Sequence, residues 1–217
     1  LEFNMTKYRL HYFNARGYAE ASRAMFHMAG VEFEDVRYEI DDWIKEENTL
    51  KNEMPFGQMP VLEVDGEKIP QSVAIARFVA NQLGFAGQTP VEKAWADAFT
   101  DLYKDFLIDM KPWAMIAFGY PGAAGDRDEL KKTSLDPAKE KYFKLLSKRL
   151  EKSKSGFLLD SGISFPDLFF FETTTSLIEL EKGFLGTDFP VVNAYFKRIA
   201  EHPKLKPYLE TRPYSSK

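Results

Sequence analysis

The chain has 217 residues, of which 44% are hydrophobic and 29% are charged, and its formal net charge is −4. This composition is ordinary for a globular protein, and the acidic balance argues against a nucleic-acid partner or a polybasic membrane surface. The sequence contains no cysteine, so disulfides, thiolate metal sites and thiol catalysis by the protein are excluded. We also expect no membrane-spanning segment and no signal peptide.

The first third of the sequence alternates predicted strands and helices. Tyr8 to Phe13 alternates polar and apolar side chains, which is typical of a half-buried strand. An apolar helical run from Ala19 to Ala29 follows and ends at Gly30. A second strand is expected over Phe33 to Tyr38, and the polar stretch from Asp41 to about Lys51 is expected to be partly helical.

Residues 56–76 carry the densest set of signals. Val61 to Val64 reads as an apolar strand, Asp65-Gly66 is typical of a hairpin turn, and a short second strand ends at Ile69-Pro70. A helix is then expected over Ser72 to Gln82, and the free N–H groups of its first turn could hold an anion. The same hairpin and capped helix also occur in domains that bind nothing there.

A proline stands directly before the first strand of this hairpin. We predict that the Met59-Pro60 bond is cis and that the backbone beside it pairs with an extended peptide ligand. The order of strands and helices up to this point is that of a thioredoxin-like domain, with a parallel crossover followed by an antiparallel hairpin.

The rest of the chain is predicted to be helical. Long apolar patterns run from Pro90 to about Ile116 and from Asp136-Pro137 onward, and Ser164 to Asp167 matches a capping box before an apolar helix. Phe169-Phe170-Phe171 in that helix is expected to be core. We therefore predict a cloning remnant at 1–4, a thioredoxin-like domain at 5–82, a linker at 83–90 and an all-α domain at 91–217.

Several motifs together resemble those of the glutathione transferases, in particular a sigma-like class of invertebrates, over nearly the whole chain. They are Tyr12-Phe13-Asn14-x-Arg16-Gly17, Asp42-Trp43, Pro55-Phe56-Gly57-Gln58-Met59-Pro60-Val61-Leu62, Gln71-Ser72 and Ser164-x-x-Asp167. The resemblance implies that reduced glutathione is the co-substrate and that it brings the thiol that the chain lacks.

By this resemblance, Tyr12 is the catalytic residue. Its hydroxyl would donate a hydrogen bond to the sulfur of glutathione, which favours the thiolate and so the nucleophile. Strand position alone would favour a packing role for this tyrosine. Tyr18 departs from several vertebrate relatives, which carry arginine there, and this leaves the pKa of the thiol open.

The remaining glutathione contacts are also implied by the resemblance. Trp43 and a lysine would hold the glycine end, and counting back from Pro55 gives Lys51 for the lysine, whereas counting on from Trp43 reaches Glu47. The rest of the expected glutathione site comprises Gln58, Met59, Pro60, Gln71, Ser72 and Asp105.

Asp105 would reach the γ-glutamyl ammonium across a homodimer interface, although a solvated helix face is the usual place for an aspartate. Vertebrate relatives bind a metal here through several acids, but Lys104 places a positive charge beside Asp101 and Asp105, so we expect no metal. Phe13 and Trp113, with residues near Pro207 to Leu209, are candidates for the electrophile pocket, or equally for the core.

The expected function is conjugation of the glutathione thiolate to small hydrophobic electrophiles, as in detoxification, by a cytoplasmic homodimer with no nucleic-acid or membrane partner. Two alternatives remain. A glutathione-dependent isomerase such as a prostaglandin D synthase would share every glutathione residue and differ in the electrophile pocket. A carrier or lens-type structural protein would share the fold without needing the full set of site residues.

Overall fold

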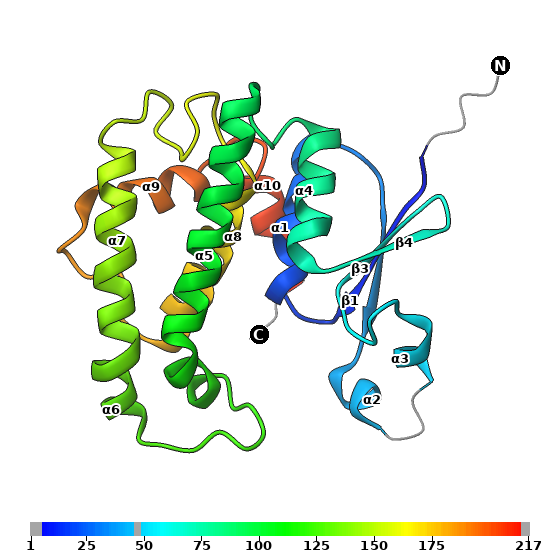
Figure 1. The fold of residues 1–217 in the computed structure, drawn as a ribbon, viewed down its shortest axis with the longest axis horizontal. Helices are drawn as coiled ribbons and strands as arrows, with labels where there is room; N and C mark the ends of the chain where they lie inside the picture. The colour runs from blue at the N-terminus through cyan, green and yellow to red at the C-terminus, as the bar shows by residue number, and fades with distance from the viewer. Residues whose placement is uncertain (1–5, 46–48, 214–217) are drawn as a thin grey trace. The chain divides into compact units, whose positions relative to one another are not determined.

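The computed structural model describes residues 6–45 and 49–213, which fall into two units (Figure 1). The first unit holds the described residues up to Phe85 together with those from Pro203 onward, and the second runs from Ala86 to His202. The predicted remnant at 1–4 lies outside the described residues.

A four-stranded sheet forms the centre of the first unit. Its strands are β1 (Tyr8–Phe13), β2 (Glu34–Tyr38), β3 (Val61–Val64) and β4 (Glu67–Pro70), in the spatial order β2-β1-β3-β4. β1 and β2 are parallel, and the other neighbouring pairs are antiparallel, with Leu10 opposite Leu62. The predicted thioredoxin-like order is thereby confirmed.

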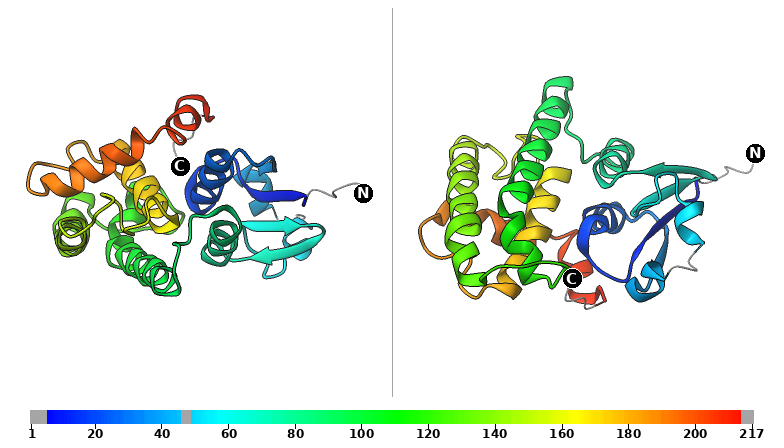
Figure 2. Two further views of the ribbon diagram at one scale, coloured as in Figure 1. Left: turned by 90° about the horizontal axis from the view of Figure 1, so that it is seen from above. Right: turned by 60° about the horizontal axis from the view of Figure 1, so that its bottom comes forward.

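Helices α1 (Glu20–Ala29) and α4 (Ser72–Leu83) pack side by side next to this sheet (Figure 2). They bury Phe26 and Ile75 completely, because apolar residues recur on one face of each helix. A short 3₁₀ turn, η1 (Gly17–Ala19), leads into α1. The polar stretch after β2 contains two short helices, α2 (Ile40–Ile44) and α3 (Leu50–Glu53).

The last helix, α10 (Lys206–Thr211), packs within the first unit. The ring of Tyr208 stacks on His27 of α1, with 4.2 Å between the ring centroids. The division drawn from the sequence assigns residues 91–217 to a helical domain, whereas this last segment belongs structurally with the sheet. An amphipathic pattern reports that a helix has a buried face, but not which surface covers it.

The second unit is helical and has an aromatic core. Tyr103 contacts Phe169 and Phe170, with ring centroids 5.1 and 5.4 Å apart, and all three of Phe169-Phe170-Phe171 are buried, as predicted. The elements of this unit are α5 (Pro90–Ala117), α6 (Arg127–Leu130), the π-helical segment η2 (Lys131–Leu135), α7 (Asp136–Leu150), α8 (Phe165–Leu180) and α9 (Pro190–Ala200).

α7 begins at Asp136, as the sequence predicts, but two shorter helical segments lead into it without a break. The sequence predicts that a helix begins at Asp136-Pro137, but helical backbone already begins at Arg127, where the carboxylate of Asp126 accepts the N–H of Glu129 at 2.8 Å. The π-helical segment lies directly before Pro137. Proline has no N–H to donate and its ring crowds the preceding turn, and π-bulges are one way in which a helix absorbs such an interruption. The proline therefore marks an interruption within a longer helical stretch.

The predicted capping box at the start of α8 is present and is tied into the core. The carboxylate of Asp167 is fully buried and accepts the N–H groups of Ser164 at 2.8 Å and Leu158 at 2.9 Å. It also accepts the hydroxyls of Ser164 and Tyr195. Burial raises the pKa of Asp167 to about 6, against the opposing effect of these four donors.

None of the helices in the described part of the chain combines the length and apolar composition needed to cross a membrane.

The raised pKa of Asp167 predicts a pH-dependent stability. The folded chain holds a proton that the unfolded chain releases near pH 4, so this stabilisation is complete below about pH 4 and is lost as the pH rises through about 6. The unfolding free energy of the wild type minus that of Asp167→Asn should therefore shrink by about 3 kcal/mol between these limits, at about 1.4 kcal/mol per pKa unit. Urea unfolding of both proteins across this range measures it. A difference that grows with pH would show that the four donors outweigh burial.

Candidate active site

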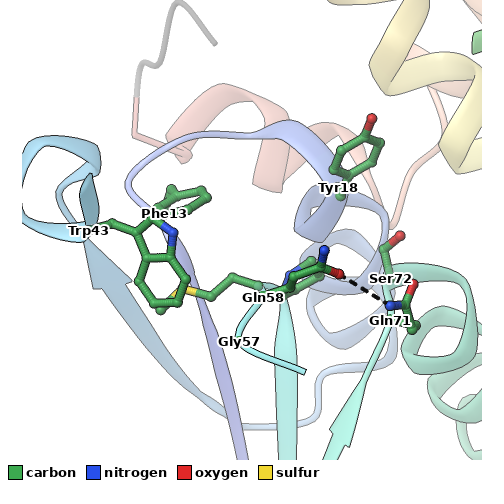
Figure 3. Close-up of a pocket in the computed structure, with 9 residues that line it drawn as sticks. Phe13, Tyr18, Trp43, Gly57, Gln58, Gln71 and Ser72 are labelled. Atoms are coloured by element: carbon green, nitrogen blue, oxygen red, sulfur yellow. Dashed lines mark hydrogen bonds between the residues drawn. The ribbon is translucent and has the colours of Figure 1, made fainter. Parts of the chain in front are cut away.

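A cavity of about 430 Å³ opens in the first unit (Figure 3). This volume lies within the range of pockets that bind small molecules. Residues from four separate stretches of the chain surround it. They are Phe13, Tyr18, Trp43, Gly57, Gln58, Met59, Pro60, Gln71 and Ser72.

Aromatic side chains form one end of the cavity, where Figure 3 shows Trp43 and Phe13 together. Trp43 comes from α2 and Phe13 from the end of β1, and their rings meet edge to face with centroids 5.7 Å apart. The ammonium nitrogen of Lys51, on α3, lies 5.7 Å from the centroid of the Trp43 ring. The structure thus brings together the two residues predicted for the glycine end. The alternative position, Glu47, lies outside the described residues.

Gln58, Met59 and Pro60 line the cavity between its two ends and lead into β3. The Met59-Pro60 bond is cis, which confirms the prediction from the sequence. The side-chain amide of Gln71 donates to the side-chain oxygen of Gln58 at 3.4 Å, so this wall is joined to the far end of the cavity.

The far end is formed by Gln71 and Ser72 at the start of α4. Gln71 has φ 73° and ψ 116°, a conformation that side chains other than glycine rarely adopt. Such strain is concentrated at ligand sites. The first intrahelical bond runs from the N–H of Ile75 to the carbonyl of Gln71 at 2.9 Å, so the N–H groups of residues 72–74 have no acceptor within the helix. This end of the cavity is suited to a carboxylate.

Tyr12 lies at the end of β1 and is 6% exposed. Its hydroxyl oxygen accepts the backbone N–H of Tyr18 at 3.2 Å. A phenol has one O–H to donate and can accept as well, so this contact orients the oxygen and does not itself use the hydroxyl proton. The neighbours of Tyr12 in the chain and across this hydrogen bond, Phe13 and Tyr18, both line the cavity.

Gly17 explains why the loop after β1 contains a glycine. Its φ is 39°, and a β-carbon added to it would lie 2.5 Å from the hydroxyl oxygen of Tyr12. No larger residue fits there unless the Tyr12 hydroxyl moves. The glycine of the Tyr-Phe-Asn-x-Arg-Gly motif therefore provides the space that the hydroxyl occupies.

Two lining residues were absent from the predicted site. Tyr18 is 49% exposed and borders the cavity, whereas the resemblance identifies it only as a departure from vertebrate relatives. Gly57 lines the cavity with φ 61°, and its place inside the Pro-Phe-Gly-Gln-Met-Pro motif is the signal that could have identified it.

Asp105 and Trp113 lie in the second unit, whereas Pro207 to Leu209 lie in α10 of the first. Asp105 is exposed on α5, and beside it Lys104 pairs with Asp101 at 3.7 Å. Trp113 is fully buried, with the guanidinium carbon of Arg127 at 5.5 Å from its ring centroid, which favours a packing role. In residues 6–45 and 49–213, no group of three or more histidine, aspartate or glutamate side chains is arranged to hold a metal ion.

Comparison with known proteins gives a consistent result. Residues 8–81 match the family described as glutathione S-transferase, N-terminal domain, and residues 108–212 match glutathione S-transferase, C-terminal domain. Glutathione S-transferase 1 of Ascaris suum is 37% identical over 209 residues, which cover 96% of this chain and 98% of the relative.

Solved structures agree with these matches. Monomeric Na-GST-3 from the hookworm Necator americanus has a TM-score of 0.90 at 42% identity, and the match covers 97% of this chain and 100% of that one. A Nu-class transferase from Haemonchus contortus has a TM-score of 0.86 at 39% identity, covering 98% of this chain and 100% of that one. Assignment to a sigma-like class stays a prediction. The chain belongs to the glutathione S-transferase family and is a glutathione transferase enzyme.

Proposed function

We propose that the cavity binds glutathione along its length and that Tyr12 activates the thiol. The observation that carries the proposal is the order of chemical groups along the cavity. An indole and a lysine lie at one end, the segment Gln58-Met59-Pro60 lies in the middle, and a helix start lies at the other end. Glutathione presents a glycine carboxylate, a cysteinyl backbone and a γ-glutamyl carboxylate in that sequence.

Each end of the cavity suits one end of the tripeptide. Trp43, through its indole N–H, and Lys51 would bind the glycine carboxylate. The backbone of Met59, between Gln58 and Pro60, would pair with the cysteinyl residue, as extended peptides pair with strand edges. Gln71 and Ser72 would hold the γ-glutamyl carboxylate on the free N–H groups of α4.

The chemistry follows from the orientation of Tyr12. A cysteine thiol has a pKa of about 8.5, so little thiolate exists at neutral pH without help. With its oxygen held by the N–H of Tyr18, the Tyr12 hydroxyl can donate a hydrogen bond to the sulfur, which favours the thiolate while the proton stays on the phenol. The thiolate, whose proton has passed to solvent, then attacks the electrophilic carbon of the second substrate. As the carbon–sulfur bond forms, a leaving group departs with its bonding pair, as chloride does from chlorodinitrobenzene.

We propose that the second substrates are small hydrophobic electrophiles, as in detoxification, and that Phe13 contacts them. Phe13 lines the cavity with its ring centroid 5.1 Å from that of Tyr12, so an apolar group held there would lie near the activated sulfur. We propose no metal, since Lys104 brings a positive charge between the acids of α5. A cytoplasmic location suits a reaction that consumes reduced glutathione.

We also propose a homodimer in which Asp105 of the partner chain completes each glutathione site. An exposed carboxylate on α5 and two large exposed apolar side chains on the same helix, Val91 at 67% and Trp95 at 55%, support an interface there. The γ-glutamyl ammonium needs an anionic partner when it leaves water, and Asp105 would supply one.

Replacing Tyr12 tests the catalytic proposal directly. Tyr12→Phe should keep the fold and the affinity for glutathione but lower turnover with chlorodinitrobenzene on the order of 10²–10³-fold, because one donor to the anion is lost. Tyr8→Phe, on the same strand, is the matched control and should retain activity. Wild-type conjugation by Tyr12→Phe would remove this residue from the catalytic role. Conversion of a prostaglandin endoperoxide without conjugation would support the isomerase alternative.

Two glycine-to-alanine variants distinguish displacement of the Tyr12 hydroxyl from the effect of backbone strain alone. Gly17→Ala would press on the Tyr12 hydroxyl and should lower kcat by at least roughly tenfold, which corresponds to about 1.4 kcal/mol in the barrier. Gly30→Ala has a similar φ of 65° but meets nothing within 4 Å, so it should lower the thermal midpoint and leave kcat near wild type. Equal kcat values for the two variants would contradict this explanation of the motif.

The dimer proposal is tested at Asp105. Asp105→Ala should raise the Michaelis constant for glutathione with less effect on kcat, whereas Asp101→Ala, one turn earlier, should not. If Asp105 acts in trans, a mixed dimer of Asp105→Ala and Tyr12→Phe chains has one site with both changes and one with neither, so activity returns on mixing. A fully active monomer in sedimentation would overturn the proposal.

A further inference from the structure

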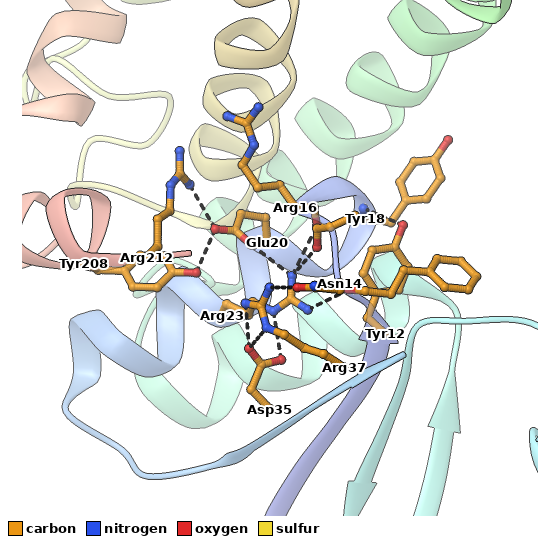
Figure 4. A network of polar contacts seen from close by, with 12 residues as sticks. Tyr12, Asn14, Arg16, Tyr18, Glu20, Arg23, Asp35, Arg37, Tyr208 and Arg212 are labelled. Atoms are coloured by element: carbon orange, nitrogen blue, oxygen red, sulfur yellow. Dashed lines mark hydrogen bonds and ion pairs between the residues drawn. The ribbon is translucent and has the colours of Figure 1, made fainter. Parts of the chain in front are cut away.

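Arg23 is a fully buried charge behind the loop that follows β1. Its guanidinium donates to the carbonyl oxygen of Ala15 at 2.7 Å and to that of Phe13 at 3.3 Å (Figure 4). The guanidinium carbon also lies 5.7 Å from the centroid of the Tyr12 ring, within the range of a cation–π contact. A third, longer contact reaches the carbonyl oxygen of Arg16 at 3.5 Å. One side chain of α1 thus holds the end of β1 and the loop after it, and faces the ring of the proposed catalytic residue.

Two carboxylates neutralise this charge. Glu20 accepts from Arg23 at 3.1 Å and Asp35 accepts at 3.0 Å. Burial acts to lower the pKa of Arg23, but the two carboxylates outweigh it and the pKa is raised, so the guanidinium remains charged. His27, on the same helix, adds no charge at neutral pH because burial lowers its pKa. A buried charge held in this way has little freedom to move.

Further partners hold the two carboxylates. The hydroxyl of Tyr208 and the guanidinium of Arg212, in α10 and just after it, donate to Glu20 at 2.7 and 3.0 Å. On the other side, Arg37 donates to Asp35 at 2.8 Å and to the side-chain oxygen of Asn14 at 3.3 Å. Figure 4 shows the resulting chain of alternating charges, which runs from α10 to the loop beside Tyr12.

The loop held by Arg23 continues directly into Gly17 and Tyr18. These are the residues that leave space for the Tyr12 hydroxyl and donate a hydrogen bond to it. A shift of the carbonyls at Phe13 and Ala15 would therefore move the groups that orient the hydroxyl. The cavity residues Trp43, Gln71 and Ser72 come from other elements and make none of these contacts.

We propose that Arg23 is a positioning residue for Tyr12, and that α10 holds Arg23 in place through Glu20. The proposal rests on the proposed catalytic role of Tyr12. Loosening this network lets the hydroxyl move away from the sulfur, which lowers the thiolate fraction of bound glutathione while leaving the tripeptide contacts intact.

The pKa of the enzyme-bound glutathione thiol, followed by the ultraviolet absorbance of the thiolate, is the readout that a purely structural role would not move. Arg23→Lys keeps the charge but loses the planar fork. It should raise this pKa by about one unit, a tenfold loss of thiolate below the pKa, with the Michaelis constant for glutathione little changed. Tyr208→Phe removes only the hydroxyl on Glu20 and should give a smaller shift in the same direction.

Arg9→Lys is the matched control. Arg9 also pairs with two carboxylates, Glu34 at 2.7 Å and Glu63 at 3.4 Å, but makes no contact with the loop, so its variant should have the wild-type thiol pKa. A folded Arg23→Lys with an unchanged thiol pKa would overturn the proposal. If Arg23→Lys does not fold, unchanged thiol pKa values in Tyr208→Phe and Arg212→Gln would overturn it instead.

Tyr12→Phe in the same titration separates the two proposals. If its thiol pKa equals that of the wild type, the catalytic role of Tyr12 fails and the positioning role fails with it. If Tyr12→Phe raises the thiol pKa and Arg23→Lys does not, only the positioning role fails.

Discussion

The close approach of the chain to the Tyr12 hydroxyl is the constraint on which the site depends. The hydroxyl oxygen of Tyr12 has to be fixed by a group that does not accept the hydroxyl proton. The backbone N–H of Tyr18 meets this need because an N–H can only donate. That contact requires the chain to turn back within six residues of Tyr12. This reversal of the chain requires glycine at position 17, because a side chain there would meet the hydroxyl. The same reversal places Tyr18 at the border of the cavity.

The elements that line the cavity differ from those that carry the buried charges. The sheet fixes Tyr12 at the end of β1 and the segment before β3, because these strands are neighbours in register. The start of α4 supplies N–H groups by geometry alone, so no cationic side chain is needed at that end of the cavity. The buried charges lie behind the loop after β1, where they act on its backbone. Binding groups and supporting groups therefore come from different elements.

Sequence reasoning succeeded where a local pattern has one structural solution. The hairpin, the cis bond at Met59-Pro60 and the capping box of α8 all follow from turn and capping chemistry within a few residues. It failed where distant segments meet. Arg23 reads as an ordinary helical residue, since its burial depends on Asp35 and on α10. The π-helical segment before Asp136-Pro137 is also not predicted from the sequence, because an acidic residue followed by proline is equally typical of the start of a helix.

The contacts on Glu20 also bear on how the chain is made. Tyr208 and Arg212 are separated from Glu20 by 188 and 192 positions in sequence. Until these residues leave the ribosome, the carboxylate of Glu20 lacks two of its donors, although the four strands and α4 have already been synthesised. Contacts of such long range form late, because they close a very large loop. The first unit is therefore expected to reach its final packing only after the whole second unit has been synthesised, so that a chain arrested in the second unit would expose the start of α1 to chaperones or proteases.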